Sequence, residues 1–227
     1  TKESDDMIDQ LRNALVTEPI VRAVSGTSTS FNRGWSRYGY QVKGENKEAY
    51  VFRVDENYLS LFDMQLLQGR NFSATEDSTA VIVNEALVRD MGWTEPLGEY
   101  LNWREDTVGR GAPVIGVVKD YNFLSLENDI QPMFIGANNQ DFGHMTTAFV
   151  KLTPGDLSEQ LATIERVWKK TFPDKPFEYT FVDEDVAMQY ATHQRWMKIM
   201  TLSTCFAIII SCLGLFGLAG IESLNRT

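Results

Sequence analysis

Cysteine is nearly absent from this chain of 227 residues, and both of its cysteines lie near the C-terminus. Cys205 and Cys212 fall inside a long uncharged run at 199–221. They cannot cross-link the polar residues that precede this run, so the polar part must fold without disulfides. This argues against a small extracellular scaffold built on disulfides and is compatible with either the cytoplasm or the periplasm.

Signatures of catalysis and of cofactor binding are also missing from the sequence. There is no Walker A sequence, no HExxH, no CxxC and no GxSxG around a serine. The short sequence GRG at 109–111 lacks the third glycine of a dinucleotide-binding loop, and the acidic run at 183–185 suits the first turn of a helix. We therefore expect a protein that is not an enzyme, with no catalytic residues, no metal ligands and no cofactor.

Positive charge is in short supply as well. The chain has 31 acidic residues against 21 lysines and arginines, which gives a formal net charge of −10. Nucleic acid and anionic lipid attract basic surfaces, so neither is expected as the main partner.

The uncharged run at 199–221 predicts a transmembrane helix. As a helix it would extend roughly 34 Å, enough to cross a hydrocarbon core of about 30 Å. A secretory signal is excluded by position, and the preceding Arg195 and Lys198 fit a GPI signal poorly. A buried core helix is the remaining alternative, although such helices are usually shorter. Trp196 and Lys198 suit the boundary between water and lipid.

Small residues recur along this run at helical spacing. They suggest that the helix packs against other membrane helices, because small side chains let helix backbones approach closely in lipid. The alternative is that such residues are simply tolerated in membrane spans. The residues are Ser203, Ala207, Ser211, Gly214, Gly217 and Gly220.

The polar part mixes strand and helix patterns without regular alternation, which predicts an α+β fold. Helices are expected at 4–17, 57–64 and 85–91, with Gly92 ending the third, and between a cap at Asp156 and Pro173. A further helix is expected to run from about 183 without a break into the uncharged run. Strands are expected at 20–30, 38–43, 49–54, 65–72, 79–84, 99–103, 114–119, 131–136, 146–152 and 177–182.

Aromatic residues gather early in the chain. They could line a groove for a peptide or a lipid, although aromatic residues in predicted strands more often pack across strands and in the core. We interpret them as core residues. They are Phe31, Trp35, Tyr38, Tyr40 and Tyr50.

Five stretches, in this order along the chain, resemble one known family. They are FDMQLLQGRNF at 62–72, AVIVNEA at 80–86, VIGVVKDYNFLSL at 114–126 with IQP at 130–132, PFEYTFVDE at 176–184, and CLGLFGLAG at 212–220. Together they resemble the MacB-like periplasmic domain of bacterial FtsX-like ABC transporter permeases, of the type VII ABC superfamily. The resemblance covers nearly the whole chain.

The resemblance implies a domain of two parts. Residues 1–56 and 146–183 would form a porter-like subdomain, 57–145 an inserted second subdomain, 184–198 a stalk helix and 199–221 the membrane helix. Because the chain starts at Thr1 rather than Met, and stops where the family has a basic cytoplasmic segment, we expect it to be a piece of a longer protein.

The resemblance also implies a function and partners. The chain would be the extracytoplasmic domain of a permease in the bacterial inner membrane, with its bulk in the periplasm. It would couple cytoplasmic ATP hydrolysis to periplasmic motion, for export or extraction of a substrate that the sequence does not identify. Its partners would be an ABC ATPase, other membrane helices of a dimeric permease and a periplasmic protein. The alternative is the sensor domain of a membrane signalling receptor, and a membrane-anchored enzyme is a third hypothesis.

Overall fold

The computed structural model describes residues 2–31, 35–42, 44–73, 77, 79–102, 111–123, 129–137 and 142–224. For 189–195, 198, 213 and 215–224 it describes the backbone alone. The chain forms two compact units, Thr1–Tyr179 and Thr180–Thr227. Each unit is described by itself below.

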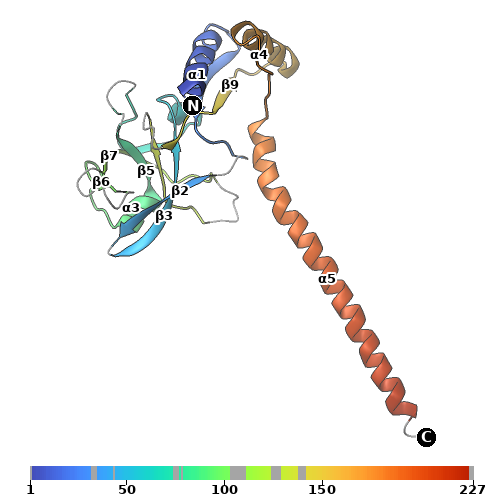
Figure 1. The fold of residues 1–227 in the computed structure, drawn as a ribbon. Coiled ribbons are helices and arrows are strands. Elements are labelled where there is room, and N and C mark those ends of the chain that lie inside the picture. The colour runs from blue at the N-terminus through green and yellow to red at the C-terminus, as the bar shows by residue number, and fades with distance from the viewer. Residues whose placement is uncertain are drawn as a thin grey trace. The chain divides into compact units, whose positions relative to one another are not determined.

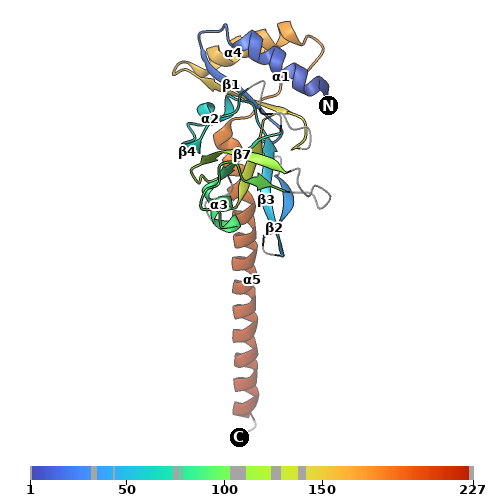
Figure 2. The ribbon, with the colours of Figure 1, turned by 90° about the vertical axis from the view of Figure 1, so that its left-hand side faces the viewer.

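A two-stranded antiparallel sheet, β1 (Val21–Thr27) with β9 (Thr147–Leu152), forms one layer of the first unit. Helices α1 (Lys2–Leu15) and α4 (Leu157–Thr171) lie side by side over it (Figures 1 and 2). Apolar residues from both helices and from β1 and β9 make a shared core. Its buried members are Leu11, Leu15, Val24, Ile164, Val167 and Phe172.

The remaining strands form a mixed seven-stranded sheet in the order β2-β3-β8-β5-β7-β4, with β6 paired to β7 beside this path. Pairing is antiparallel for β2 with β3, β5 with β8 and β4 with β7, and parallel for β3 with β8 and β5 with β7. The bounds are β2 Ser36–Val42, β3 Glu45–Arg53, β4 Leu66–Gly69, β5 Val81–Asn84, β6 Tyr100–Leu101, β7 Ala112–Val118 and β8 Met133–Gly136. Two short helices, α2 (Tyr58–Leu61) and α3 (Glu85–Met91), accompany this sheet.

Alternate residues of the central strands enter two separate apolar clusters. Phe52, Ile82 and Ile135 belong to one cluster, and Val51, Val83, Phe134 and others belong to the second. Alternation along a strand places neighbouring side chains on opposite faces, so these central strands are buried on both sides.

The early aromatic residues are core residues, as predicted. Phe31, Trp35 and Tyr50 pack in the first of these clusters, and Tyr38 and Tyr40 in the second. The ring centroids of Trp35 and Phe52 are 5.5 Å apart.

Helix ends follow the predicted capping residues. The Asp156 carboxylate accepts a hydrogen bond from the backbone N–H of Glu159 at 3.0 Å, which satisfies a donor of the first turn of α4. Gly92 ends α3 in the left-handed conformation, with φ of 70°. Both predictions are confirmed.

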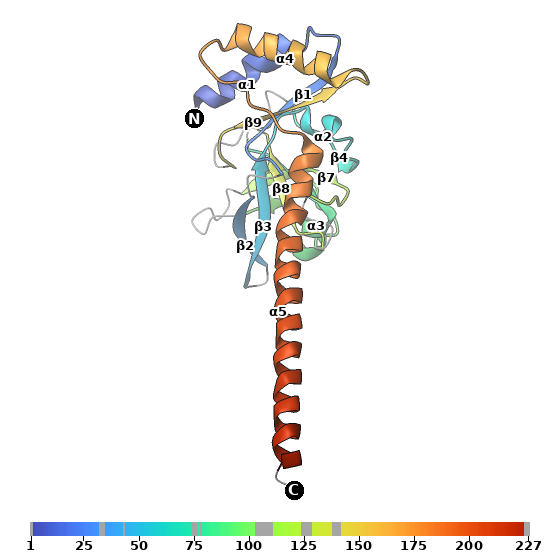
Figure 3. The same ribbon diagram turned by 90° about the vertical axis from the view of Figure 1, so that its right-hand side faces the viewer.

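The second unit consists mainly of α5 (Val182–Leu224), a helix of 43 residues. It is unbroken (Figure 3), as the sequence predicted for a helix starting near 183. Asp183, Glu184 and Asp185 occupy its first turn, so the helix-start interpretation of the acidic run is also confirmed.

The predicted strand at 177–182 is wrong. Residues 176–181 have no regular structure and Val182 already belongs to α5. Phe177 instead packs against Trp168 of α4, with ring centroids 6.0 Å apart, and the indole N–H of Trp168 donates to the Lys175 carbonyl at 3.2 Å. This apolar side chain is thus half-buried against a helix.

The predicted membrane span reaches beyond the side chains that the structure describes, since 213 and 215–221 lie outside them. Within the described residues, no helix has both the length and the apolar character needed to cross a membrane. The span at 199–221 therefore stays a prediction.

The division at 56/57 and 145/146 stays a prediction too. Strands β2 and β3 precede the first of these boundaries, and they pair in the seven-stranded sheet with β8, which follows it. The GRG sequence at 109–111 lies outside the described residues except for Gly111.

Candidate functional site at the junction of the two sheets

Strand β3 runs from the large sheet directly to the end of β1. Val54 forms an isolated antiparallel bridge with Thr27, and the Ser28 N–H donates to the Arg53 carbonyl at 2.9 Å. On the other side, the Val54 N–H donates to the Gly136 carbonyl of β8 at 3.0 Å. The two sheets are therefore joined through backbone hydrogen bonds at this crossing.

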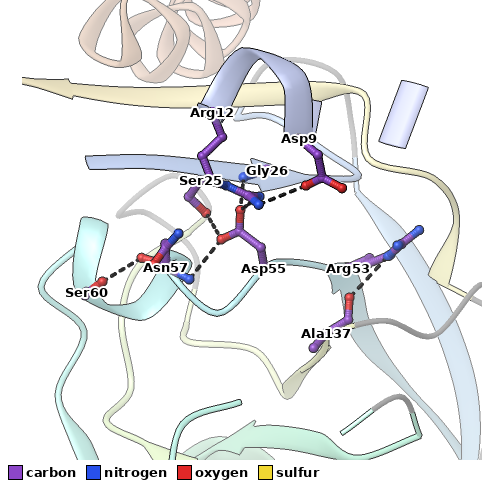
Figure 4. A network of polar contacts seen from close by, with 9 residues as sticks. All are labelled: Asp9, Arg12, Ser25, Gly26, Arg53, Asp55, Asn57, Ser60 and Ala137. Carbon is purple, nitrogen blue, oxygen red and sulfur yellow. Dashed lines mark hydrogen bonds and ion pairs between the residues drawn. The ribbon is translucent and has the colours of Figure 1, made fainter. Parts of the chain in front are cut away.

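Asp55 lies at this crossing and is only 3% exposed. Its carboxylate accepts hydrogen bonds from the Ser25 hydroxyl at 2.7 Å and from the backbone N–H groups of Gly26 at 2.6 Å and Asn57 at 3.0 Å (Figure 4). It also forms an ion pair with Arg12 of α1. A buried carboxylate is tolerable only with such partners, so Asp55 fixes α1, β1 and the start of α2 in one arrangement.

A second ion pair at the junction joins Arg53, at the end of β3, to Asp5 of α1. Here α1 supplies the anion, whereas in the first pair it supplies the cation. Arg53 Nη1 lies 2.9 Å from Asp5 Oδ2, and Arg53 Nε donates to the Ala137 carbonyl at 3.2 Å. Asp5 also accepts from the Met145 N–H at 2.7 Å and lies 3.0 Å from His144 Nδ1. Helix α1 thus contributes one anion and one cation to the junction.

The electrostatics of Asp5 follow from this setting. Partial burial raises the pKa of its carboxyl, but hydrogen bonds from His144, the Met145 N–H and Arg53 outweigh burial and hold the pKa below the ordinary 3.8. The charged form of Asp5 is therefore the one that the fold stabilises.

A cleft of about 460 Å³ opens where α2 meets the ends of β4 and β7. The apolar part of its lining consists of half-buried residues that pack against the first apolar cluster. They are Phe31, Phe62, Met64 and Tyr121. Burial raises the pKa of Tyr121 well above its ordinary value, so its hydroxyl stays neutral. The remaining lining residues are Tyr58, Asp63, Gln65, Lys119, Asp120 and Asn122.

The carboxylates of this cleft are already engaged. Asp63 lies 2.6 Å from Lys151 Nζ, and Asp120 accepts from Arg89 at 2.6 Å and from the Ala86 N–H at 2.9 Å. Carboxylates committed in this way hold elements together and are poorly suited to proton transfer. Across the described ranges, no three His, Cys, Asp or Glu residues are grouped so that they could hold a metal ion.

The sequence had indicated none of the junction residues, because their partners lie far apart along the chain. One signal was available. Arg53 interrupts the apolar stretch from Ala49 to Val54, and an arginine inside a buried strand needs a buried anion nearby.

Comparisons with known proteins support the resemblance stated above. The periplasmic region of MacB from Actinobacillus actinomycetemcomitans is 17% identical, with a TM-score of 0.56 over 78% of this chain and 79% of that one. A domain of a putative permease from Porphyromonas gingivalis is 22% identical, with a TM-score of 0.52 over 76% and 86%. The extracellular domain of the ABC-type transporter YknZ from Gram-positive bacteria is 14% identical, with a TM-score of 0.52 over 74% and 84%.

At these identities the solved structures show a shared fold. A comparison with curated protein sequences finds no match. The model of the MacB-like periplasmic core domain, however, matches residues 1–165. The family expected from the sequence motifs is therefore confirmed, and the chain belongs to the MacB-like periplasmic core domains.

Proposed function

We propose that this chain is the non-catalytic extracytoplasmic domain of an ABC transporter permease subunit, and that α5 carries motion between that domain and the membrane. The observation that supports this most is the continuity of α5, which runs over 43 residues from an acidic first turn into the uncharged run at 199–221. Such a helix is about 64 Å long, enough for a stalk and a membrane span in one element.

The hydroxyl groups within the run are compatible with lipid. Ser203 Oγ donates to the Ile199 carbonyl at 2.9 Å, and Ser211 Oγ to the Ala207 carbonyl at 2.8 Å. Each hydroxyl is thus satisfied inside its own helix, which lipid requires because it offers no hydrogen-bonding partner. In this proposal residues 199–221 are the membrane span, which anchors the chain in the bacterial inner membrane. Residues 184–198 are the stalk.

The junction of the two sheets gives the periplasmic part its stiffness. Motion passed along a helix is useful only if the body attached to it moves as a block. The ion pairs of Arg12 with Asp55 and of Arg53 with Asp5 lock α1 to the large sheet. We propose the division into a porter-like part, 1–56 with 146–183, and an inserted part, 57–145. The two parts are joined at the junction by the hydrogen bonds from Arg53 to the Ala137 carbonyl and from the Met145 N–H to Asp5.

The partners proposed are a cytoplasmic ABC ATPase that supplies the energy, further membrane helices of a dimeric permease and a periplasmic protein. The small residues Ser203, Ala207 and Ser211 would face the neighbouring helices, since they share one side of α5. The substrate is exported or extracted rather than chemically changed.

The test is a flexible Gly-Gly-Ser insertion after Ala191, made in the full-length transporter. A rigid stalk predicts that transport is lost while the ATPase subunit still binds and hydrolyses ATP. The control is the same insertion after Gly98, in a turn where an added Cβ would meet no atom within 4 Å, and there transport should persist. Full transport with the insertion after Ala191 would refute the proposal that α5 acts as a rigid stalk.

The orientation is tested separately by replacing Lys170, at the exposed end of α4, with cysteine. A membrane-impermeant maleimide should label this residue in intact cells whose outer barrier is permeable. Labelling only after lysis would place the domain on the cytoplasmic side.

A further inference from the structure

The large sheet has two end strands, and they differ in how well they are protected. Strand β4 has four residues, a register irregularity between Leu66 and Gln68, and a final Gly69 with φ of 75°. Shortness and bulges are the usual devices that keep an edge strand from pairing with another chain.

Strand β2, at the other end, has none of these devices. Its seven residues pair with β3 in an unbroken register from Ser36 with Val51 to Val42 with Glu45. Among the residues that the structure describes, β3 is its one partner strand. β2 contains no proline, and Arg37 is its one charged residue. A long regular edge of this kind is a template for a further strand.

The side chains on the two faces of β2 determine which residues an added strand would contact. Tyr38, Tyr40 and Val42 lie on the face packed against the second apolar cluster, where Tyr38 and Val42 are still half-buried. Arg37, Gly39 and Gln41 lie on the opposite, exposed face. An added strand would therefore need apolar residues on one face and small or polar residues on the other.

The sequence of β2 itself meets this requirement. In an antiparallel pair of two β2 strands centred on Gly39, Tyr38 of one copy faces Tyr40 of the second. Arg37 then faces Gln41, so no like charges are opposed. The two glycines face each other at the two-fold axis, and all seven residues are paired. A patch that is complementary to itself is what a two-fold symmetric contact requires.

We propose that β2 is a dimerisation edge, along which two copies of this domain join their large sheets through an antiparallel β2–β2 pair. The contact is small, so it is weak between free domains. It becomes effective when both copies are held near each other in one membrane, where the local concentration is high. The proposal rests on the geometry of β2 and on the membrane anchoring proposed above, and it does not depend on transport.

Position 39 allows a direct test, because the glycine there is not required by the monomer. A Cβ at this position would meet one atom, the Lys47 carbonyl oxygen, at an ordinary 3.8 Å. A lysine at 39 would also lie beside Glu48, its neighbour on β3. Gly39→Lys is therefore tolerated by the fold, yet it places two lysines opposite each other at the two-fold axis.

The experiment uses the full-length protein in membranes, with Cys205 and Cys212 replaced by serine. One copy carries Arg37→Cys and the other Gln41→Cys, and disulfide formation between them under mild oxidation is the readout. The proposal predicts cross-linked dimers, with a loss of at least tenfold when both copies carry Gly39→Lys or both carry Gly39→Glu. Cross-linking should return when one copy carries Gly39→Lys and the other Gly39→Glu.

The rescue by opposite charges separates the proposal from misfolding, since a damaged domain would not recover when mixed with another. The melting temperature of the Gly39→Lys protein should also be unchanged or raised, because glycine weakens a strand. Three results would overturn the proposal. They are the absence of a cross-link with glycine at 39, equal cross-linking in all combinations, and cross-linking to a different protein.

Discussion

Arg12 of α1 forms an ion pair with Asp55, 43 residues further along the chain, and this contact ties the helical layer to the crossing of the two sheets. The reverse pair, Arg53 with Asp5, lies alongside it. Helix α1 supplies the cation of the first pair and the anion of the second. The helix therefore cannot slide along the sheet or turn about its axis without separating both pairs.

Asp55→Asn is expected to destabilise the domain strongly. The amide keeps the volume of the side chain but removes the charge that Arg12 faces, and it turns an N–H₂ group toward donors such as Ser25. Breaking a buried, hydrogen-bonded ion pair in this way costs about 3–5 kcal/mol. Urea denaturation of the purified chain, followed by tryptophan fluorescence, measures the loss.

The matched control for this substitution is Lys169→Ala, which removes an exposed ion pair with Glu165 on α4. Such pairs contribute about 0.3–0.5 kcal/mol. Equal losses for the two variants would contradict the role given to Asp55.

Asp5→Asn is expected to change stability in a pH-dependent way. The pKa of Asp5 is held below the ordinary 3.8 by His144, Met145 and Arg53, so folding favours the ionised carboxylate. Its contribution is fully present above about pH 5 and is lost as the pH falls through the folded pKa. The gap in unfolding free energy between wild type and variant, about 1–3 kcal/mol at pH 7, should shrink below pH 4. A gap that is constant from pH 7 to pH 3 would show that the charge of Asp5 is not what matters.

Asn84→Ala tests a buried cap at the end of β5. The Asn84 side chain accepts from the N–H groups of Leu87 and Met133, each at 3.0 Å, and donates to the Gln131 carbonyl at 2.9 Å. Alanine leaves these three groups, two buried and one half-buried, without the Asn84 side chain, at an expected total cost of about 3 kcal/mol.

Asp156→Ala is the comparison, because Asp156 caps α4 with a single exposed hydrogen bond to Glu159. Its loss should cost about 1 kcal/mol. Thermal unfolding of both variants shows which substitution lowers the stability more. A larger loss of stability for Asp156→Ala would show that the hydrogen bonds of Asn84 are weak.

Gly69→Ala tests why the GR pair of the 62–72 motif has glycine at its first position. Gly69 has φ of 75°, and a Cβ there would lie 2.1 Å from the Ile115 carbonyl oxygen. The left-handed conformation alone costs alanine about 1 kcal/mol, and displacing β7 adds to it. Gly98→Ala has a similar φ of 86° with open space around it, so it isolates the conformational part. Equal melting temperatures for the two variants would mean that β4 and β7 are less tightly packed than described.

Local patterns in the sequence predicted much of the fold. The β-branched residues before Asn84 indicated β5, Gly92 the end of α3, and Asp156 the start of α4, because each acts through atoms close by in the chain. The unbroken α5 followed in the same way from an apolar side marked by Val186, Tyr190 and Met197, with no proline after 183.

Features that depend on distant partners could not be predicted. Strands β2 and β3 are consecutive and pair with each other, yet β3 also pairs with β8, some 80 residues later. Phe177 gave a strand pattern but found its contact on α4. The polar residues of the junction were missed for the same reason, since an aspartate after a strand does not reveal that an arginine of the first helix will reach it.

The central claim is that α5 moves as one rigid element during the ATP cycle. Spin labels at Met188 and Ser211, in a protein with both native cysteines replaced, would be separated by roughly 35 Å along a continuous helix. Pulsed electron resonance on the full-length transporter should give a narrow distribution at this distance with and without ATP. The distance from Met188 to a label on the ATPase should change on ATP binding. A broad or ATP-dependent distance within α5, with no change relative to the ATPase, would contradict the account.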